Sequence, residues 1–212
     1  MTSLEPECPD DLPPDDLYSQ ALGFESPLHA AQLMLLLETF ELHWKDRTDI
    51  FAAGNLTIEF STLERTGETL GAPDFFVVLG AQRGPRKSWN ISREGGKYPN
   101  VIVEVLAPST AAFDRGTKKR IYQDVFRTPE YFWFDPETKE FSGFHLVDGR
   151  YTPLAPDASG RLWSAQLGLF LGVHQGKLRF FTKEGALVPT GRELAARLAD
   201  KLRALGVDPD AL

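Results

Sequence analysis

Three side chains in this 212-residue chain are of the types, and in the places, that could do chemistry: Asp74, Glu104 and Lys118. Glu104 lies inside the run from Val101 to Leu106, which is otherwise apolar and typical of a strand covered on both faces. Side chains alternate along a strand, so Glu104 shares a face with Ile102. A carboxylate placed there is costly unless it is paired or bound to a metal.

The segment after this strand predicts a helix with a lysine on its buried face. The stripe that defines this face consists of Ile121, Tyr122, Val125 and Phe126. A step of about 100° per residue places Lys118 near the centre of the stripe. Asp114 falls on the stripe as well, whereas Lys119 and Arg120 point to its rim or to water. Lys118 therefore needs a carboxylate partner, and Glu104 is the obvious one.

Asp74 opens the other strong strand, Phe75 to Leu79, where a second acid could approach Glu104 at a sheet edge. Two carboxylates and a lysine on adjacent elements can bind a hard divalent cation and align a water molecule. The alternative is a structural salt bridge between Glu104 and Lys118, with Asp114 capping the helix. Either reading requires these elements to be neighbours in the fold.

The rest of the pattern supplies elements that could hold these residues. Ser26-Pro27 begins a helix that runs to about Arg47 and is apolar on nearly all sides. Further expected strands are 56–60, 131–135, 141–147, 150–154, 167–173 and 177–181, with a loop at 67–71. Thr190 and Glu193 predict a capping box before a helix with a leucine stripe that ends at Gly206. We expect an irregular segment at 1–24, one domain at 25–188, and a helix with a tail at 189–212.

Composition restricts the function classes. The net charge of −7 argues against indiscriminate binding of nucleic acid through a uniformly basic surface. A single cysteine, Cys8, excludes an intramolecular disulfide, and the longest apolar block is too short to cross a membrane. These features predict a cytoplasmic protein without a membrane partner.

One segment, 81–100, is nevertheless basic and interleaved with aromatic residues. Its cationic residues are Arg83, Arg86, Lys87, Arg93 and Lys97. It is either a solvated loop or a surface that faces nucleic acid. For the histidines and acids of the first helix, His29, His43, Glu38 and Glu41, we expect solvated or structural roles.

Several short segments of the sequence match motifs of one known family, in the order of that family and close to the family's spacing. They are Gly71-Ala72-Pro73-Asp74, the run VIVEV at 101–105 followed by Leu-Ala-Pro-Ser-Thr at 106–110, Asp114-Arg115-Gly116 with Lys118 and Tyr122, and the run from Pro129 to Pro136. In these segments the chain resembles the Uma-two family of restriction-endonuclease-like proteins, a branch of the PD-(D/E)xK nuclease superfamily. The resemblance covers residues 71–151.

The resemblance implies an α/β (α+β) fold with a restriction-endonuclease-like core: a mixed central sheet flanked by helices, with an added β-hairpin region. It also implies an endonuclease that hydrolyses DNA and depends on Mg²⁺ or Mn²⁺. Asp74 and Glu104 match the superfamily's two acids as metal ligands, and Lys118 stands in for a lysine that the superfamily usually has at the position of Leu106. Asp114 and Tyr122 match supporting positions.

A second hypothesis is a catalytically silent module that keeps the nuclease fold and acts in binding or self-association. It would use the apolar first helix and the leucine stripe from Leu194 to Leu205. The apolar first helix also makes a homodimer the expected assembly.

Overall fold

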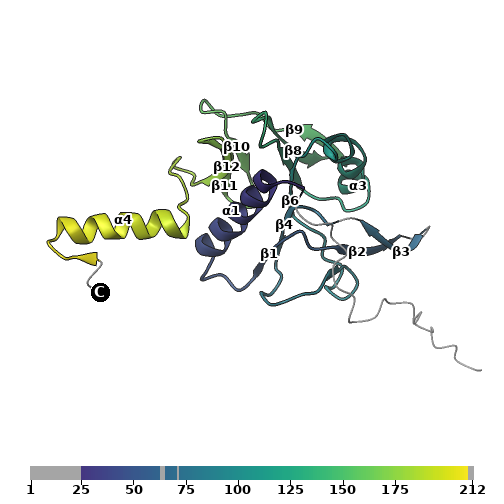
Figure 1. Ribbon diagram of the computed structural model, residues 1–212. Coiled ribbons are helices and arrows are strands. Elements are labelled where there is room, and N and C mark those ends of the chain that lie inside the picture. The colour runs from purple at the N-terminus through teal and green to yellow at the C-terminus, as the bar shows by residue number, and fades with distance from the viewer. Residues whose placement is uncertain (1–24, 63–64, 71, 210–212) are drawn as a thin grey trace, which may run out of the picture.

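A six-stranded mixed sheet forms the centre of the molecule. The computed structural model describes residues 25–62, 65–70 and 72–209 (Figure 1), so the predicted irregular segment 1–24, with Cys8, lies outside the described residues. In spatial order the strands are β1 (Ile50–Gly54), β4 (Phe75–Leu79), β6 (Val101–Val105), β7 (Glu130–Phe134), β8 (Phe141–Val147) and β9 (Arg150–Pro153). β6 and β7 run parallel and the other neighbours run antiparallel. The predicted mixed central sheet flanked by helices is confirmed.

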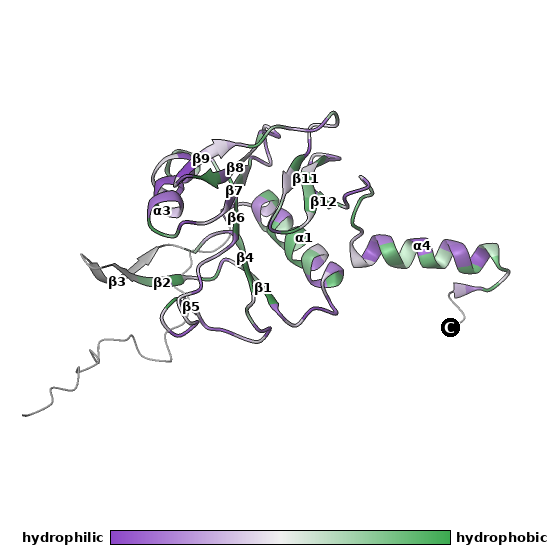
Figure 2. Ribbon diagram, turned by 180° about the vertical axis from the view of Figure 1, so that it is seen from behind, coloured by the Kyte–Doolittle hydropathy of each residue, from purple (hydrophilic) through white to green (hydrophobic). Residues whose placement is uncertain are grey.

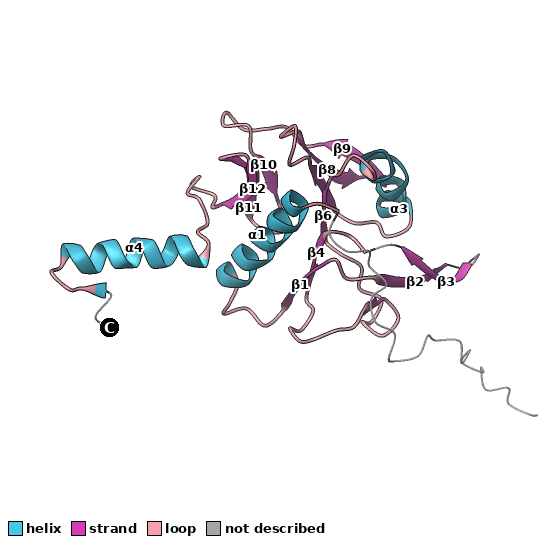
Figure 3. Cartoon of the chain, in the orientation of Figure 1, coloured by secondary structure: helices cyan, strands magenta, loops and turns pink. Residues whose placement is uncertain are grey.

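Each face of this sheet is covered by a helical element and a small sheet (Figure 3). One face packs against α1 (Pro27–His43) and a sheet of β10 (Leu162–Ser164), β11 (Leu169–His174) and β12 (Lys177–Phe181). The other face packs against the segment of α2 (Ala111–Phe113), η1 (Asp114–Lys118) and α3 (Lys119–Asp124), and a sheet of β3 (Arg65–Leu70), β2 (Ile58–Thr62) and β5 (Trp89–Asn90). Successive residues of β6 therefore enter different cores.

α1 begins where the sequence predicts. The Ser26 hydroxyl accepts a hydrogen bond from the His29 N–H at 3.1 Å, and Pro27 occupies the first turn, where its missing N–H costs nothing. The helix ends at His43, before the predicted Arg47, because the buried Trp44 caps it. Its inner side packs on the sheet, while Leu28 and Met34 on its outer side are more than half exposed.

The helix after β6 contains a π-helical turn. Residues Asp114–Lys118 form η1, and the Lys119 N–H donates to the Asp114 carbonyl five residues earlier. Such turns are frequent at functional sites. Asp114 does not cap the helix; it lies inside it.

Two parts of the central region differ from the prediction. The expected loop at 67–71 is wrong up to Leu70, because β3 pairs with β2 through Thr69 and Leu70 in an antiparallel ladder; Gly71 lies outside the described residues. β1 was not predicted, since Ala-Ala-Gly has little intrinsic strand preference, and its pairing with β4 determines its conformation.

The last helix, α4 (Gly191–Ala204), extends away from the body of the molecule (Figures 1 and 2). It begins with the predicted capping box, in which Thr190 and Glu193 satisfy each other's backbone N–H groups. None of its residues is buried against the described parts of the chain. Across the described ranges, no helix is both long and apolar enough to cross a membrane.

Candidate functional site

The two predicted acids meet at the start of β4 and in the middle of β6. The Asp74 N–H donates to Glu104 Oε2 at 3.1 Å, and Asp74 Oδ2 accepts from the Val105 N–H at 2.7 Å. The Asp74 carbonyl accepts from the Asn55 N–H, which fixes the backbone of this residue just before β4. The antiparallel pairing of β4 with β6 therefore brings together two acids that are thirty residues apart in the sequence.

Lys118 contacts two carboxylates, those of Glu104 and Asp114. It approaches Glu104 at Oε1, whereas the Asp74 N–H binds Oε2. Its Nζ is 3.2 Å from Glu104 Oε1 and 2.8 Å from Asp114 Oδ1. The Tyr122 hydroxyl donates to Glu104 Oε1 at 2.6 Å. Glu104 has 0% relative exposure, so these groups of the chain take the place of water around its carboxylate. The predicted neighbourhood of Glu104, Asp114, Lys118 and Tyr122 is thus present in the fold.

A histidine for which the sequence predicted only a solvated or structural role completes the cluster. His29, in the first turn of α1, places Nε2 2.9 Å from Asp74 Oδ1 and is buried. Its spacing gave a signal: His29, Leu33, Leu36 and Phe40 follow the 3–4 pattern of the buried helix face. This pattern marks His29 as buried but does not indicate that its helix face meets Asp74.

The environment shifts the proton affinities of these groups strongly. Burial raises the pKa of Glu104 to about 8, with Lys118 opposing this shift and Asp74 and Asp114 adding to it. Burial likewise raises the pKa of Asp114. Burial disfavours the charged form of Lys118, but the charges of Glu104 and Asp114 outweigh it and raise its pKa above the usual range. Lys118 is therefore an ammonium group at neutral pH.

His29 behaves in the same way on the other side of the site. Burial lowers the pKa of His29, but its hydrogen bond to Asp74 and the Asp74 charge reverse this and raise it above its usual value. His29 therefore holds Asp74 through a charge-assisted contact. Each acid of the pair has its own cationic partner.

The donor set suits a hard cation of the magnesium kind. Within residues 25–62, 65–70 and 72–209, no group of three or more His, Cys, Asp or Glu side chains is arranged to hold a metal ion. Mg²⁺ usually takes only one or two protein carboxylates and fills its octahedron with water and substrate phosphates. Asp74 and Glu104 supply two such carboxylates. Both Asp74 oxygens and Glu104 Oε2 have a second lone pair beside the partner named above, whereas Glu104 Oε1 already contacts both Tyr122 and Lys118.

The basic segment at 81–100 has several contacts within the chain. Arg83 donates to the Trp44 and Arg47 carbonyls and pairs with Glu41. Arg86 pairs with Glu94 at 2.5 Å and lies over the Phe51 and Trp89 rings. The Lys97 ammonium donates to the Gly80 carbonyl. The exposed cations of the segment are Lys87, Arg93 and Lys97. A role in contacting nucleic acid stays a prediction for these residues.

The acids of α1 lie apart from Asp74 and Glu104 in their contacts. Glu38 accepts the Gly191 N–H at the start of α4 at 2.9 Å, and Glu41 is the partner of Arg83. His43 is exposed and packs edge-on against Trp44. These contacts are structural in kind, as expected.

Comparison with known proteins adds to this geometry. The profile of the Uma2 family, described as "Putative restriction endonuclease", matches residues 23–176. A curated relative, "Uncharacterized protein slr1290" of Synechocystis sp., is 38% identical over 77 residues, which are 36% of this chain and 40% of that protein. The chain thus matches less than half the length of this relative. The crystal structure of a "putative nuclease belonging to DUF820" from Anabaena variabilis ATCC 29413 covers 63% of this chain and 70% of its own, with a TM-score of 0.45 and 16% identity.

The matched region contains the whole cluster, from His29 to Tyr122, together with the central sheet. The family match assigns the chain to the class described as "Putative restriction endonuclease". The chain belongs to the Uma2 family. β12 and α4 lie beyond the matched residues.

Proposed function

We propose that this protein is a metal-dependent endonuclease that hydrolyses phosphodiester bonds of DNA. The observation that carries the proposal is the direct contact of Asp74 with Glu104 from neighbouring strands, with a lysine ammonium on the same Glu104. Family membership supports nuclease chemistry in general. The residue roles, the metal and the substrate are our proposal.

Asp74 and Glu104 are the proposed ligands of one Mg²⁺ or Mn²⁺ ion. When bound, such an ion polarises a phosphoryl oxygen and lowers the pKa of a coordinated water. His29 and the Val105 N–H hold the two Asp74 oxygens in place, which makes His29 a positioning residue. Tyr122 does the same for Glu104.

Lys118 acts as a cation rather than as a general base in this proposal. Its pKa is raised by Glu104 and Asp114, so it has no free lone pair to accept a proton from water at neutral pH. An ammonium group beside Glu104 can instead orient the attacking water and offset the negative charge that develops on the phosphate. Asp114 keeps Lys118 aimed at Glu104 from 2.8 Å.

Cleavage assays test the proposal with matched variants. Supercoiled, linear and single-stranded DNA are incubated with the full chain and Mg²⁺ or Mn²⁺. Asp74→Asn, Glu104→Gln and Lys118→Met should each lower the rate by a factor of about 100 or more. Asp49→Asn changes an exposed acid whose side chain pairs with Arg47 and serves as the control, which should cut like the wild type. Cleavage that persists unchanged in both Asp74→Asn and Glu104→Gln would refute the proposal.

Metal titration separates this function from the catalytically silent module. That alternative is favoured by one observation: the oxygens of Asp74 and Glu104 already have partners from the chain itself. Calorimetry with Mn²⁺ should show binding to the wild type and none to Asp74→Asn. A folded wild type that takes up no Mn²⁺ at millimolar concentration and cuts no DNA would identify the silent module.

A further inference from the structure

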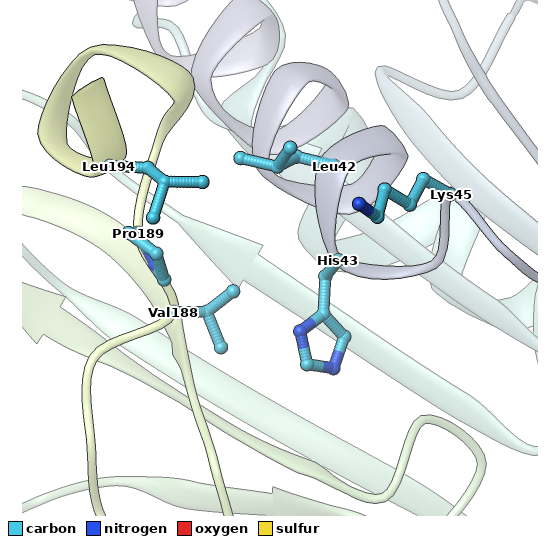
Figure 4. Close-up of a pocket in the computed structure, with 6 residues that line it drawn as sticks. All are labelled: Leu42, His43, Lys45, Val188, Pro189 and Leu194. Carbon is cyan, nitrogen blue, oxygen red and sulfur yellow. The ribbon is translucent and has the colours of Figure 1, made fainter. Parts of the chain in front are cut away.

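The C-terminal helix is fixed at its base and exposed along its length. Glu193 binds Arg179 of β12 through two hydrogen bonds of 3.0 and 2.7 Å, and Glu38 of α1 accepts the Gly191 N–H. Leu194 meets Leu42 across a shallow pocket at the junction (Figure 4). Beyond this first turn, α4 extends away from the domain (Figure 1). α4 is therefore a directed arm.

The arm has an apolar stripe whose outer part is exposed in the described chain. The stripe consists of Leu194, Leu198, Leu202 and Leu205. Leu198 is 52% exposed and Leu205 78% exposed. An isolated helix of this length is marginal in water, because helical stability in proteins comes mostly from the packing of an apolar face. The stripe predicts a partner.

The outer face of α1 offers a matching surface. Its middle is apolar, and Leu28 and Met34 are 52% and 57% exposed there. α1 contains two glutamates and no lysine or arginine, whereas α4 contains four cationic and two anionic residues. The two helices thus have opposite net charges within a chain whose total charge is −7. The Glu38 carboxylate has a backbone N–H as its partner, whereas Glu41 is paired with Arg83.

We propose that the protein forms a twofold dimer by arm exchange, in which α4 of each copy packs its leucine stripe on the outer face of α1 of the other. The arm leads away from its own domain, so the helix that covers this α1 face comes from a second copy (Figures 1 and 3). Twofold symmetry then forms the contact twice. This doubling matters, because specific interfaces bury roughly 1,200–2,000 Å² and a single pairing of helices about 21 Å long is small by comparison.

The arm lies beyond the region that the Uma2 profile matches, so the proposal concerns an addition to the family fold and does not depend on the nuclease proposal. The dimer would link two sites through α1, because the same helix carries His29 toward Asp74 on its inner side.

Sedimentation velocity on the full chain tests arm exchange. The wild type should sediment as a dimer at micromolar concentration. Leu198→Glu combined with Leu202→Glu should weaken the dimer by at least about 100-fold, because charges would enter the centre of the interface. Ala196→Glu is the matched control, since a step of about 100° per residue places Ala196 opposite the stripe. Met34→Glu, on α1, should dissociate the dimer as the arm variant does.

Cross-linking supplies the second measurement. In a Cys8→Ala background, Met34→Cys with Leu198→Cys should give a disulfide-linked dimer on mild oxidation, while either cysteine alone should not cross-link to the same extent. A wild type that sediments as a monomer would overturn the proposal. So would a dimer that survives the arm variant, or one that survives Met34→Glu, because the arms would then pair with each other or not at all.

Discussion

Replacing Tyr122 by phenylalanine tests how Glu104 is held. The change removes one hydroxyl from a fully buried ring and with it the 2.6 Å hydrogen bond to Glu104 Oε1. The matched control is Tyr131→Phe. Tyr131 is equally buried and donates to the Asp114 carbonyl at 3.0 Å, an uncharged acceptor. Both substitutions leave the ring packing unchanged, so the comparison isolates the acceptor.

The expected magnitudes follow from these acceptors. A hydrogen bond to a charged group contributes about 1.5–3 kcal/mol and a neutral one about 0.5–1.5 kcal/mol. Glu104 keeps Lys118 and the Asp74 N–H after the change, and the Asp114 carbonyl keeps the Lys119 N–H. We expect Tyr122→Phe to lower the free energy of unfolding by about 2 kcal/mol and Tyr131→Phe to lower it by about 1 kcal/mol.

The difference should depend on pH, because Glu104 titrates near neutrality. Its folded pKa of about 8 lies above its usual value of 4.5, so its contribution to stability is complete below pH 4.5 and is lost as pH rises through 8. The Tyr122 hydrogen bond favours the charged form of Glu104 and therefore moderates this loss. The cost of Tyr122→Phe should grow between pH 6 and pH 9.

Urea unfolding at pH 6 and pH 9, followed by tryptophan fluorescence, measures these costs in metal-free buffer. Tyr131→Phe should cost the same at both values. Equal costs for the two variants at pH 9, or a Tyr122→Phe cost that falls as pH rises, would show that Glu104 is not the buried carboxylate described above.

Two further predictions concern the rest of the fold. Arg179 lowers the pKa of Glu193 to about 2, so the stability from this pair is present above pH 4.5 and lost as pH falls toward 2. Glu193→Gln should remove this pH dependence of the free energy of unfolding. The effect should be at most about 1 kcal/mol, because the pair is partly exposed, and urea unfolding at pH 2 to 5 measures it. Gly143→Ala should cost about 1–3 kcal/mol in thermal unfolding, because its Cβ would lie 2.5 Å from the Phe132 ring, while Gly116→Ala, with nothing within 4 Å, should be neutral or stabilising; equal melting temperatures for the two variants would contradict this.

The strands and the trio of Asp74, Glu104 and Lys118 could be predicted because each leaves a local signal. An apolar run interrupted by one acid indicates a buried strand, and helical phase selects one lysine among three consecutive cations at 118–120. Thirty residues separate the two acids, however, and only the pairing of β4 with β6 brings them into contact.

His29 and the small sheets could not be predicted in the same way. The phase of α1 marks His29 as buried but does not say that the start of β4 lies opposite it. β1 and β10 are short and carry weak intrinsic preference, so their partners determine them. The contacts of Arg83 with Glu41 and with the Trp44 and Arg47 carbonyls are equally non-local, and a charge count along the chain does not reveal them.

The π turn at Asp114–Lys118 has a consequence for insertions and deletions. The turn holds one residue more than α-helical geometry needs, and within it Asp114 meets Lys118 while Tyr122 still reaches Glu104. Loss of a single residue here would restore a regular helix in which the aspartate and the lysine, then three residues apart, still share one face. The wide turn is therefore the place in this segment where the chain can shorten by one residue at the least cost to the cluster.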